Sequence, residues 1–322
     1  MRVGPAGAIG LPVELVRWPG AYAGHGGYGG GRIALLHGTA GYQLALGRRS
    51  AHGFVLGLAP IDLRGSQARR LAGWLDERRV VAAAAGDGGH DVVAVAVDGT
   101  VTTLVGGPGD DLPDTVVDGA VLYHRAVGAT TELWRHGPDG ERRLAEVTSA
   151  AAAANLVRCA GDRTRPCVLE ELRGSALHYL LIDPGTGARG PEVYRAPLTG
   201  RFLRSHALSP DGQTLAVVDG ASAVTTVAVA TGATTRHELR PGAEAQSIAW
   251  AADGASLLVT AFSGGDELFN LIRLGLDGRR RTAASSNYRW FWRAHEAPTG
   301  DAVAVQARDL ELDIWLVEGL AP

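Results

Sequence analysis

The sequence predicts an all-β fold, because one pattern of turns and strands recurs along most of the chain. Within residues 202–280 a tight turn, a strand, a second strand and another tight turn occur twice in succession. The two Asp-Gly turns at Asp211 and Asp253 lie 42 residues apart (253 minus 211). Asp-Gly between apolar runs is a strong hairpin signal, since a type I′ turn needs positive φ at both central residues. A period in the forties with short strands is typical of a propeller blade. We therefore predict a β-propeller of four-stranded antiparallel blades.

The number of blades follows from the strands between the turns. A second family of turns alternates with the first, at Asp98-Gly99, Asp139-Gly140, Thr186-Gly187, Thr231-Gly232 and Asp277-Gly278. The central strands that we expect are Ile33–Leu36, Val80–Ala84, Val121–His124, Val168–Leu172, Leu215–Val218, Leu257–Ala261 and Val303–Gln306. Several are apolar without alternation, as expected for strands buried on both faces between neighbouring blades. These seven strands predict seven blades, with six as the alternative because the first unit is poorly formed.

The chain divides into a loose tail, residues 1–10, and a single propeller domain, residues 11–322. The last unit offers three strands, one short of a blade: Phe291–Glu296, Val303–Ala307 and Ile314–Val317. A strand at Val13–Trp18 would complete this blade and remove the open edges at both ends of the ring. We expect the ring to close in this way. Helical patterns are confined to residues 66–77 and 149–157.

Composition bears on the partners. The net charge of −3 gives no basic footprint, so we expect no nucleic-acid partner. No run of 18 apolar residues occurs, so we expect no direct insertion into a membrane. The first residues lack a charged region followed by an apolar core, and we predict no secretory signal. These observations leave the compartment open.

Two cysteines and the scattered histidines are the remaining candidates for special chemistry. Cys159 and Cys167 flank a polar loop, and this spacing places them across one hairpin, where a disulfide is geometrically feasible. The alternative is two independent, half-buried thiols. No CxxC occurs and the ten histidines are scattered singly, so we predict no metal or cofactor site. No Gly-x-Ser-x-Gly elbow occurs, and we predict no catalytic residue.

The densest aromatic cluster marks the candidate binding site. It begins at Tyr288 and is followed directly by Arg293 and His295. The strand nearest the axis starts here, and its start borders the mouth of the central channel, where aromatic and Arg side chains are good anchors. Packing between blades is the alternative interpretation of the aromatic residues. The candidate binding residues are Tyr288, Trp290, Trp292, Arg293, His295, Arg204 and His206.

Several motifs from Arg158 to the end of the chain point to one family. They are Arg158-Cys159, Pro166-Cys167-Val168-Leu169, Leu208-Ser209-Pro210-Asp211-Gly212, the run from Gln246 through Trp250 to Gly254, and Asp313-Ile314-Trp315-Leu316-Val317-Glu318. This segment resembles the WD40-like (PD40, TolB-like) propellers at the C-termini of bacterial Ser/Thr protein kinases and winged-helix regulators. The resemblance implies a sensor or interaction propeller with both cysteines at family positions. No kinase or winged-helix domain accompanies it, so kinase activity is not carried over.

The function that we expect is that of a non-catalytic sensor or interaction module. It would bind a protein, a peptide or a small ligand at the channel mouth, a protein or peptide partner being the first expectation. The alternative is a propeller enzyme, lactonase-like or lyase-like, with a metal in the central channel. That alternative predicts several Asp, Glu, Asn or His side chains converging on the axis. A structural scaffold is the third hypothesis, and it predicts an exposed apolar patch on a flat face.

Overall fold

The computed structural model describes residues 21–28, 32–50, 53–56, 61, 70–128, 130–147, 156–162, 164–197, 205–220, 222–265, 268–287 and 289–317. The chain forms two compact units. Unit 1 comprises Met1–Gly41 and Leu310–Pro322, and unit 2 comprises Tyr42–Asp309. The predicted tail and the predicted closing strand Val13–Trp18 lie outside the described residues. No helix that could span a membrane occurs in these ranges.

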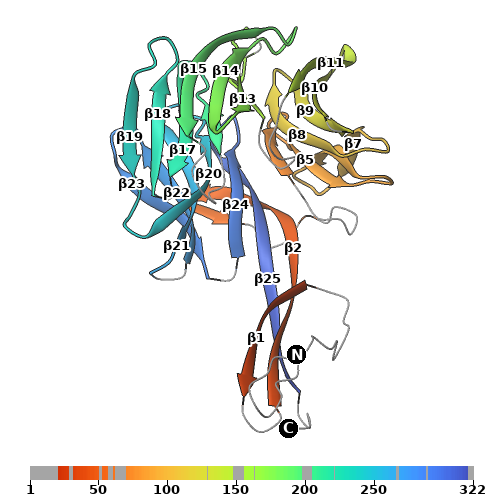
Figure 1. Cartoon of the computed structure of the whole chain (residues 1–322), viewed down its shortest axis with the longest axis vertical. Coiled ribbons are helices and arrows are strands. Elements are labelled where there is room, and N and C mark those ends of the chain that lie inside the picture. Colours follow the sequence, from red (N-terminus) through yellow and green to blue (C-terminus); the bar gives the residue numbers. More distant parts are fainter. Residues whose placement is uncertain are drawn as a thin grey trace. The chain divides into compact units, whose positions relative to one another are not determined.

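Unit 2 is built from six antiparallel sheets (Figure 1). Five of them are blades of four consecutive strands. Blade 1 contains β4 (Arg70–Trp74), β5 (Arg79–Ala85), β6 (His90–Ala96) and β7 (Val101–Val105). Blade 2 contains β8 (Asp111–Val117), β9 (Ala120–Val127), β10 (Thr130–Gly137) and β11 (Gly140–Val147). Blade 3 contains β12 (Val157–Cys159), β13 (Cys167–Arg173), β14 (Ala176–Ile182) and β15 (Arg189–Pro197). Blade 4 contains β16 (His206–Leu208), β17 (Thr214–Gly220), β18 (Ala223–Ala228) and β19 (Thr234–Glu238). Blade 5 contains β20 (Ala243–Trp250), β21 (Ser256–Ser263), β22 (Leu268–Gly275) and β23 (Arg280–Ser286).

The sixth sheet combines strands from both ends of the sequence, and we call it the closing blade. Its hydrogen-bonded order is β24, β25, β2, with β3 paired to β2. The bounds are β2 (Arg32–Ser50), β3 (Gly53–Leu56), β24 (Arg289–Glu296) and β25 (Ala302–Val317). The strand predicted at Ile314–Val317 is therefore not separate, because β25 continues through it. Unit 1 contains β1 (Ala21–Tyr28), which pairs antiparallel with the start of β2.

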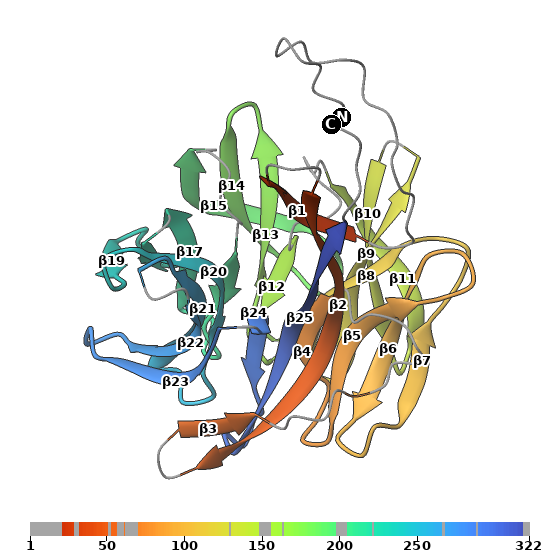
Figure 2. The ribbon, with the colours of Figure 1, turned by 90° about the horizontal axis from the view of Figure 1, so that it is seen from below.

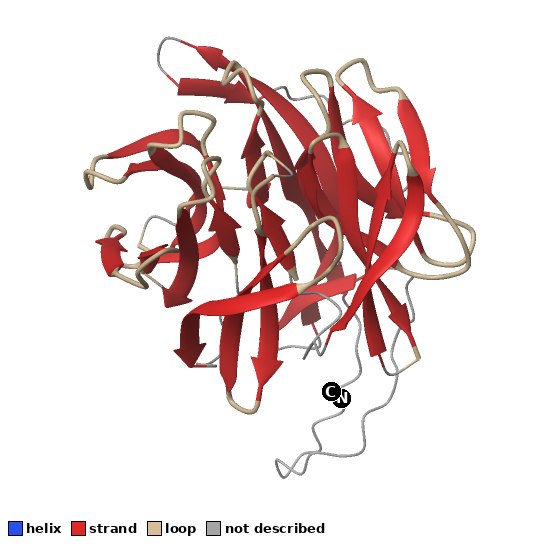
Figure 3. Cartoon of the chain, turned by 90° about the horizontal axis from the view of Figure 1, so that it is seen from above, coloured by secondary structure: helices blue, strands red, loops and turns tan. Residues whose placement is uncertain are grey.

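The prediction of seven blades is wrong, and the alternative of six is correct. Six of the seven predicted central strands lie in the second strand of a blade: β5, β9, β13, β17, β21 and β25. The seventh, Ile33–Leu36, lies in β2, which pairs with β25 instead of starting a blade of its own. The helical pattern at residues 66–77 is also misleading, since β4 occupies Arg70–Trp74 as the inner strand of blade 1. None of the residues that the structure describes is helical (Figure 3).

The six sheets of unit 2 form a closed ring. The innermost strands β4, β8, β12, β16, β20 and β24 each contact the next, and β24 contacts β4 (Figure 2). Apolar side chains fill the space between blades. Leu44 and Ala304 of the closing blade, for example, pack with Leu71 and Val80 of blade 1, and all four are at most 1% exposed. Burial on both faces explains why the second strands read as continuous apolar runs.

Two tryptophans at the ends of inner strands tie neighbouring blades together. Trp74 Nε1 donates to the His295 carbonyl at 2.9 Å, from blade 1 to the closing blade. Trp250 Nε1 donates to the Ala207 carbonyl at 3.1 Å, from blade 5 to blade 4. Each indole thus contributes apolar packing and satisfies a buried donor at the same time. Trp250 of the family motif is a structural residue of the ring.

The Asp-Gly turns use two geometries. In Asp118-Gly119 both residues have positive φ, 48° and 71°, as a type I′ turn requires. Asp118 is the only non-glycine residue with positive φ in the described ranges. Elsewhere the Asp side chain caps the turn: Asp211 Oδ1 accepts from Gln213 N at 3.0 Å, and Asp253 Oδ1 accepts from Ala255 N at 3.0 Å. The predicted hairpins are present, but the type I′ geometry does not extend to these two turns.

Candidate functional site

A row of partly exposed aromatic rings lies on blade 5 and the closing blade, and we call it the aromatic row. Its members, in spatial order, are Tyr42, Trp292, Trp290, Phe269 and Phe262. Consecutive ring centroids lie 6.0, 5.1, 5.4 and 5.1 Å apart. The Arg308 guanidinium lies 5.7 Å from the Tyr42 centroid and 6.0 Å from the Trp290 centroid, within cation–π range.

Strand register brings these rings to one end of the two blades. Phe262 near the end of β21 pairs with Phe269 near the start of β22, and Trp290 near the start of β24 pairs with Arg308. Side chains of paired residues point to the same face of a sheet, so the two members of each pair lie close to each other. The indole N–H of Trp290 is buried and has no hydrogen-bond partner among the described residues. The row therefore keeps an unused donor.

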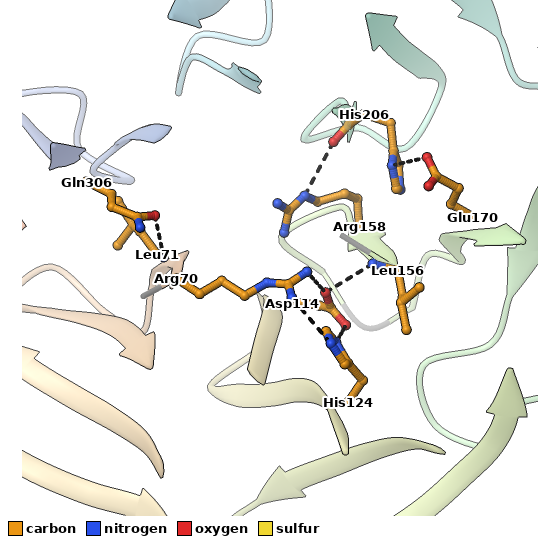
Figure 4. Close-up of polar contacts among 9 residues, drawn as sticks. All are labelled: Arg70, Leu71, Asp114, His124, Leu156, Arg158, Glu170, His206 and Gln306. Atoms are coloured by element: carbon orange, nitrogen blue, oxygen red, sulfur yellow. Dashed lines mark hydrogen bonds and ion pairs between the residues drawn. The ribbon is translucent and has the colours of Figure 1, made fainter. Parts of the chain in front are cut away.

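A second group of residues lies around the axis, on the inner strands and on the second strands β9 and β13, and we call it the axial polar cluster. It comprises Arg70, Asp114, His124, Arg158, Glu170, His206, Arg293 and His295. Its centre is Asp114, whose side chain is fully buried. Asp114 Oδ1 accepts from Arg70 Nη2 at 2.8 Å and from Leu156 N at 3.1 Å, and Oδ2 lies 3.0 Å from His124 Nδ1 (Figure 4). One carboxylate thus connects blades 1, 2 and 3.

The protonation pattern of this centre follows from its contacts. Arg70 Nη1 lies 3.3 Å from His124 Nε2, and a guanidinium can only donate. This contact assigns the His124 ring proton to Nδ1, facing Asp114. Burial raises the pKa of Asp114, but interactions with His124, Arg70 and Arg158 outweigh it and hold the pKa below the ordinary value. The carboxylate is therefore ionised at neutral pH.

Arg158 extends the cluster to blades 3 and 4. Its Nε donates to the His206 carbonyl at 3.3 Å, while its Nη1 is buried and has no hydrogen-bond partner in the described part of the chain (Figure 4). His206 Nδ1 lies 3.5 Å from Glu170 Oε2. The His206 ring packs edge-on against Tyr179, with the two ring centroids 5.3 Å apart. Burial lowers the pKa of Arg158 to about 10. The charges of Asp114 and Glu170 oppose this shift, and repulsion from Arg70 adds to it.

Arg293 and His295, both on β24, connect the cluster to the closing blade. Arg293 is 8% exposed, and its Nη1 is buried without a hydrogen-bond partner among the described residues. Its pKa is lowered by burial first, and then by the charges of Arg70 and Arg158. Tyr42 of the aromatic row acts on the same guanidinium, so Arg293 borders both groups. Burial, together with the charges of Arg158 and Arg293, lowers the pKa of His295 to about 3.

The structure distributes the predicted binding residues over these two groups. Trp290 and Trp292 lie in the aromatic row, and the other three described residues, Arg293, His295 and His206, lie in the axial polar cluster. Tyr288 and Arg204 fall outside the described residues. Sequence reasoning missed other members of the cluster as site residues, notably Arg70, Asp114 and Arg158. Arg158 carried a signal, because it is a single charged residue in an apolar strand, between Val157 and Cys159.

The cysteines lie beside the cluster. Cys159 and Cys167 are register partners in β12 and β13, with Cα atoms 4.1 Å apart, and the structure joins them in a disulfide. In the ranges that the structure describes, no group of three or more His, Cys, Asp or Glu side chains is placed to hold a metal ion.

Comparisons with known proteins extend the resemblance to the whole ring. No family model and no curated protein matches the sequence. Solved structures match at low identity. A protein from Agrobacterium tumefaciens assigned to TolB has a TM-score of 0.62 at 10% identity, over 85% of this chain and 99% of that one. TolB from Acinetobacter baumannii has a TM-score of 0.53 at 13% identity, over 88% and 65% of the two chains. An oligogalacturonate lyase in complex with manganese has a TM-score of 0.54 at 13% identity, over 82% and 77%. At these identities the comparisons establish the fold alone: the chain is a β-propeller, similar in structure to TolB propellers and to an oligogalacturonate lyase.

Proposed function

We propose that this propeller is a non-catalytic sensor or interaction module that binds its ligand at the end of the ring where the aromatic row meets Arg293. The observation that carries the proposal is the aromatic row itself. Five partly exposed rings follow one another in space, and the guanidinium of Arg308 lies over two of them, Tyr42 and Trp290. Tryptophan, tyrosine and arginine are enriched among the side chains that anchor a bound partner, and the two aromatic residues bury a large area at low entropic cost.

The arrangement suits recognition of a peptide or small ligand with an apolar and a charged part. The rings supply flat apolar surface, and the unpaired indole N–H of Trp290 supplies a donor. The buried guanidinium of Arg293, which borders Tyr42, and that of Arg158 supply positive charge. A ligand that uses all of these features would be held at several points without any bond being broken.

The proposal is tested by affinity capture with the immobilised full chain, followed by identification of retained proteins and small molecules. Three baits are compared: the wild type, Trp290→Ala and Trp134→Ala. Trp134 is the matched control, since its ring is also partly exposed but lies on β10, within another blade. We expect a species retained by the wild type and the control and lost from Trp290→Ala. Identical recovery on all three baits would contradict the proposal.

A metal-dependent propeller enzyme is the competing function. It predicts a metal ion on the axis, bound by His and carboxylate side chains. The test is thermal unfolding of the full chain after treatment with a chelator and after addition of manganese. We expect the same Tm in both conditions. A manganese-dependent rise in Tm that is lost on His206→Ala would favour the enzyme.

A further inference from the structure

The axial polar cluster contains more buried positive charge than its own residues neutralise. Arg70, Arg158 and Arg293 come from three different blades and are only 2%, 6% and 8% exposed. The buried carboxylates within the cluster are Asp114 and Glu170, which are 0% and 4% exposed. Histidines do not offset a positive charge. Among the described residues of the cluster, three guanidiniums therefore face two carboxylates.

The two carboxylates attract Arg158 through space but leave hydrogen-bond donors of Arg158 and Arg293 unsatisfied. Both oxygens of Asp114 are occupied, Oδ1 by Arg70 and the Leu156 amide and Oδ2 by His124. Glu170 Oε2 lies beside His206 and makes no hydrogen bond to a described residue. Neither carboxylate donates its lone pairs to the Nη1 groups of Arg158 and Arg293, which remain without partners in the described structure.

Internal water would satisfy these N–H groups but would not cancel their charge. A buried guanidinium without a counter-ion is costly, because desolvation is not repaid by attraction. The guanidinium cannot avoid this desolvation cost by losing a proton, since it stays protonated in proteins. An anion placed between Arg158 and Arg293 would supply both the missing acceptors and the missing charge.

We propose that Arg158 and Arg293 bind the carboxylate or phosphate group of a small acidic ligand. The inference rests on the proposed function, because it names the chemical class of the ligand that the same end of the ring would take. Paired guanidiniums are suited to this task, since each presents parallel N–H donors that match the two oxygens of an oxyanion. The aromatic row beside Arg293 would contact the apolar part of the same molecule.

The test is the Tm of the full chain during titration with inorganic phosphate and, separately, with acetate, at ionic strength held constant with sodium chloride. Ligands that bind only the native state raise Tm with concentration. We expect a rise of a few degrees with one of the two anions, which identifies the preferred group. Arg158→Gln and Arg293→Gln should each abolish the rise. Because they remove buried uncompensated charge, both variants should retain at least the wild-type Tm in chloride alone.

Controls separate a specific site from general salt effects. Phosphate stabilises many proteins by exclusion from their surface, so the variants decide the outcome. Arg279→Gln, which removes a side chain that is 91% exposed, should keep the full rise. Arg293→Lys keeps the positive charge but loses the paired N–H donors of the guanidinium, so this variant should show only part of the rise in Tm. No rise with either anion, or an equal rise in Arg158→Gln and Arg293→Gln, would overturn the proposal.

The outcome is also distinct from that of the capture experiment. Trp290→Ala leaves Arg158 and Arg293 in place, so it should keep the anion-dependent rise while losing captured ligand. An anion-dependent rise without any captured species would leave the anion site standing and contradict the proposed function. If a captured species depends on Trp290 but neither anion raises Tm, the proposed function stands and the anion site is contradicted.

Discussion

Asp114 and Arg70 form an ion pair that joins blade 1 to blade 2 at the ring axis, with Arg70 Nη2 2.8 Å from Asp114 Oδ1 and side chains 3% and 0% exposed. Such a pair contributes little when it is intact, because desolvation offsets the attraction. Removing one partner is far more costly, because the other charge stays buried alone. The pair also holds the Leu156 amide at the entry to blade 3. The axial contacts should therefore control the stability of the whole ring.

Asp114→Asn should lower the free energy of unfolding by about 3–5 kcal/mol, because it removes the carboxylate that is paired with the buried guanidinium of Arg70. Urea denaturation followed by tryptophan fluorescence measures the change. Glu238→Gln is the control, since it removes a carboxylate from a pair with Arg236 whose side chains are 53% and 61% exposed. The control should lose less than about 1 kcal/mol. Equal losses in the two variants would argue against a special role for Asp114.

Acidification should destabilise the ring through His295 before Asp114 is protonated. The pKa of His295 is about 3 in the folded chain, against about 6.5 in an unfolded chain. Between these values the unfolded state binds the extra proton, so stability falls as pH falls, by at most about 1.4 kcal/mol per pH unit. The contribution of Asp114 is lost at lower pH, because its folded pKa is depressed: the loss begins below the ordinary carboxyl pKa and is complete below the depressed one.

The measurement is urea denaturation at pH 7 and pH 5 for the wild type and His295→Asn. Burial also lowers the pKa of His237, so the wild-type slope contains a second contribution of the same sign. The informative quantity is therefore the difference between the two proteins. We expect the loss of stability on acidification to be smaller in His295→Asn. The same loss in both would show that His295 is already protonated in the folded chain at pH 5.

Gly187→Ala should destabilise the contact between blades 2 and 3 more than the backbone conformation alone explains. Gly187 has φ of +76°, and an added Cβ would overlap the Leu144 carbonyl. Gly232 has φ of +71° with no atom within 4 Å of the Cβ position, so Gly232→Ala isolates the conformational cost. That cost is about 1 kcal/mol. We expect Gly187→Ala to lose at least about 1 kcal/mol more in thermal unfolding, and equal losses would exclude the steric effect.

The disulfide predicts that the purified chain contains no reactive thiol. Alkylation under non-reducing conditions should leave the mass unchanged, and reduction should add two labels, one for each cysteine. For a loop of this size the cross-link contributes about 2–3 kcal/mol in the chain-entropy model. The double variant Cys159→Ser, Cys167→Ser should lose this amount, and reduced wild type should match it. Labelling without reduction would show independent thiols.

Local structure was predictable from the sequence, and ring closure was not. Hairpin turns and apolar second strands such as Leu257–Ala261 arise from contacts between neighbouring residues, so they leave a repeating pattern. The start of β2 has the same apolar character as a second strand, but its pairing with β25 joins distant parts of the chain. No local pattern distinguishes a strand that begins a blade from one that completes another. This is why seven blades were predicted in place of six.

The candidate site was predictable to a similar degree. Trp290, Trp292 and Arg293 lie within four residues of one another, so the local composition located these two members of the aromatic row, whereas Tyr42, Phe262 and Phe269 come from distant parts of the sequence. The axial polar cluster draws single residues from several blades, and its members become neighbours only when the ring is closed. Asp114 lies in a segment that resembles a turn, with Asp111 and Pro113 beside it, and this concealed an inner strand.

The composition of the closing blade also affects the order in which the protein folds. Blades 1 to 5 consist of consecutive hairpins, which form rapidly because little chain has to be closed into loops. The ring requires contacts such as that of the Leu71 amide with Gln306 Oε1, whose residues are 235 positions apart. Completion of the ring should therefore be the slow step. Until it occurs, the edges of β2 and β25 that pair with each other in the closed ring stay available to other chains, and aggregation during refolding should depend on protein concentration.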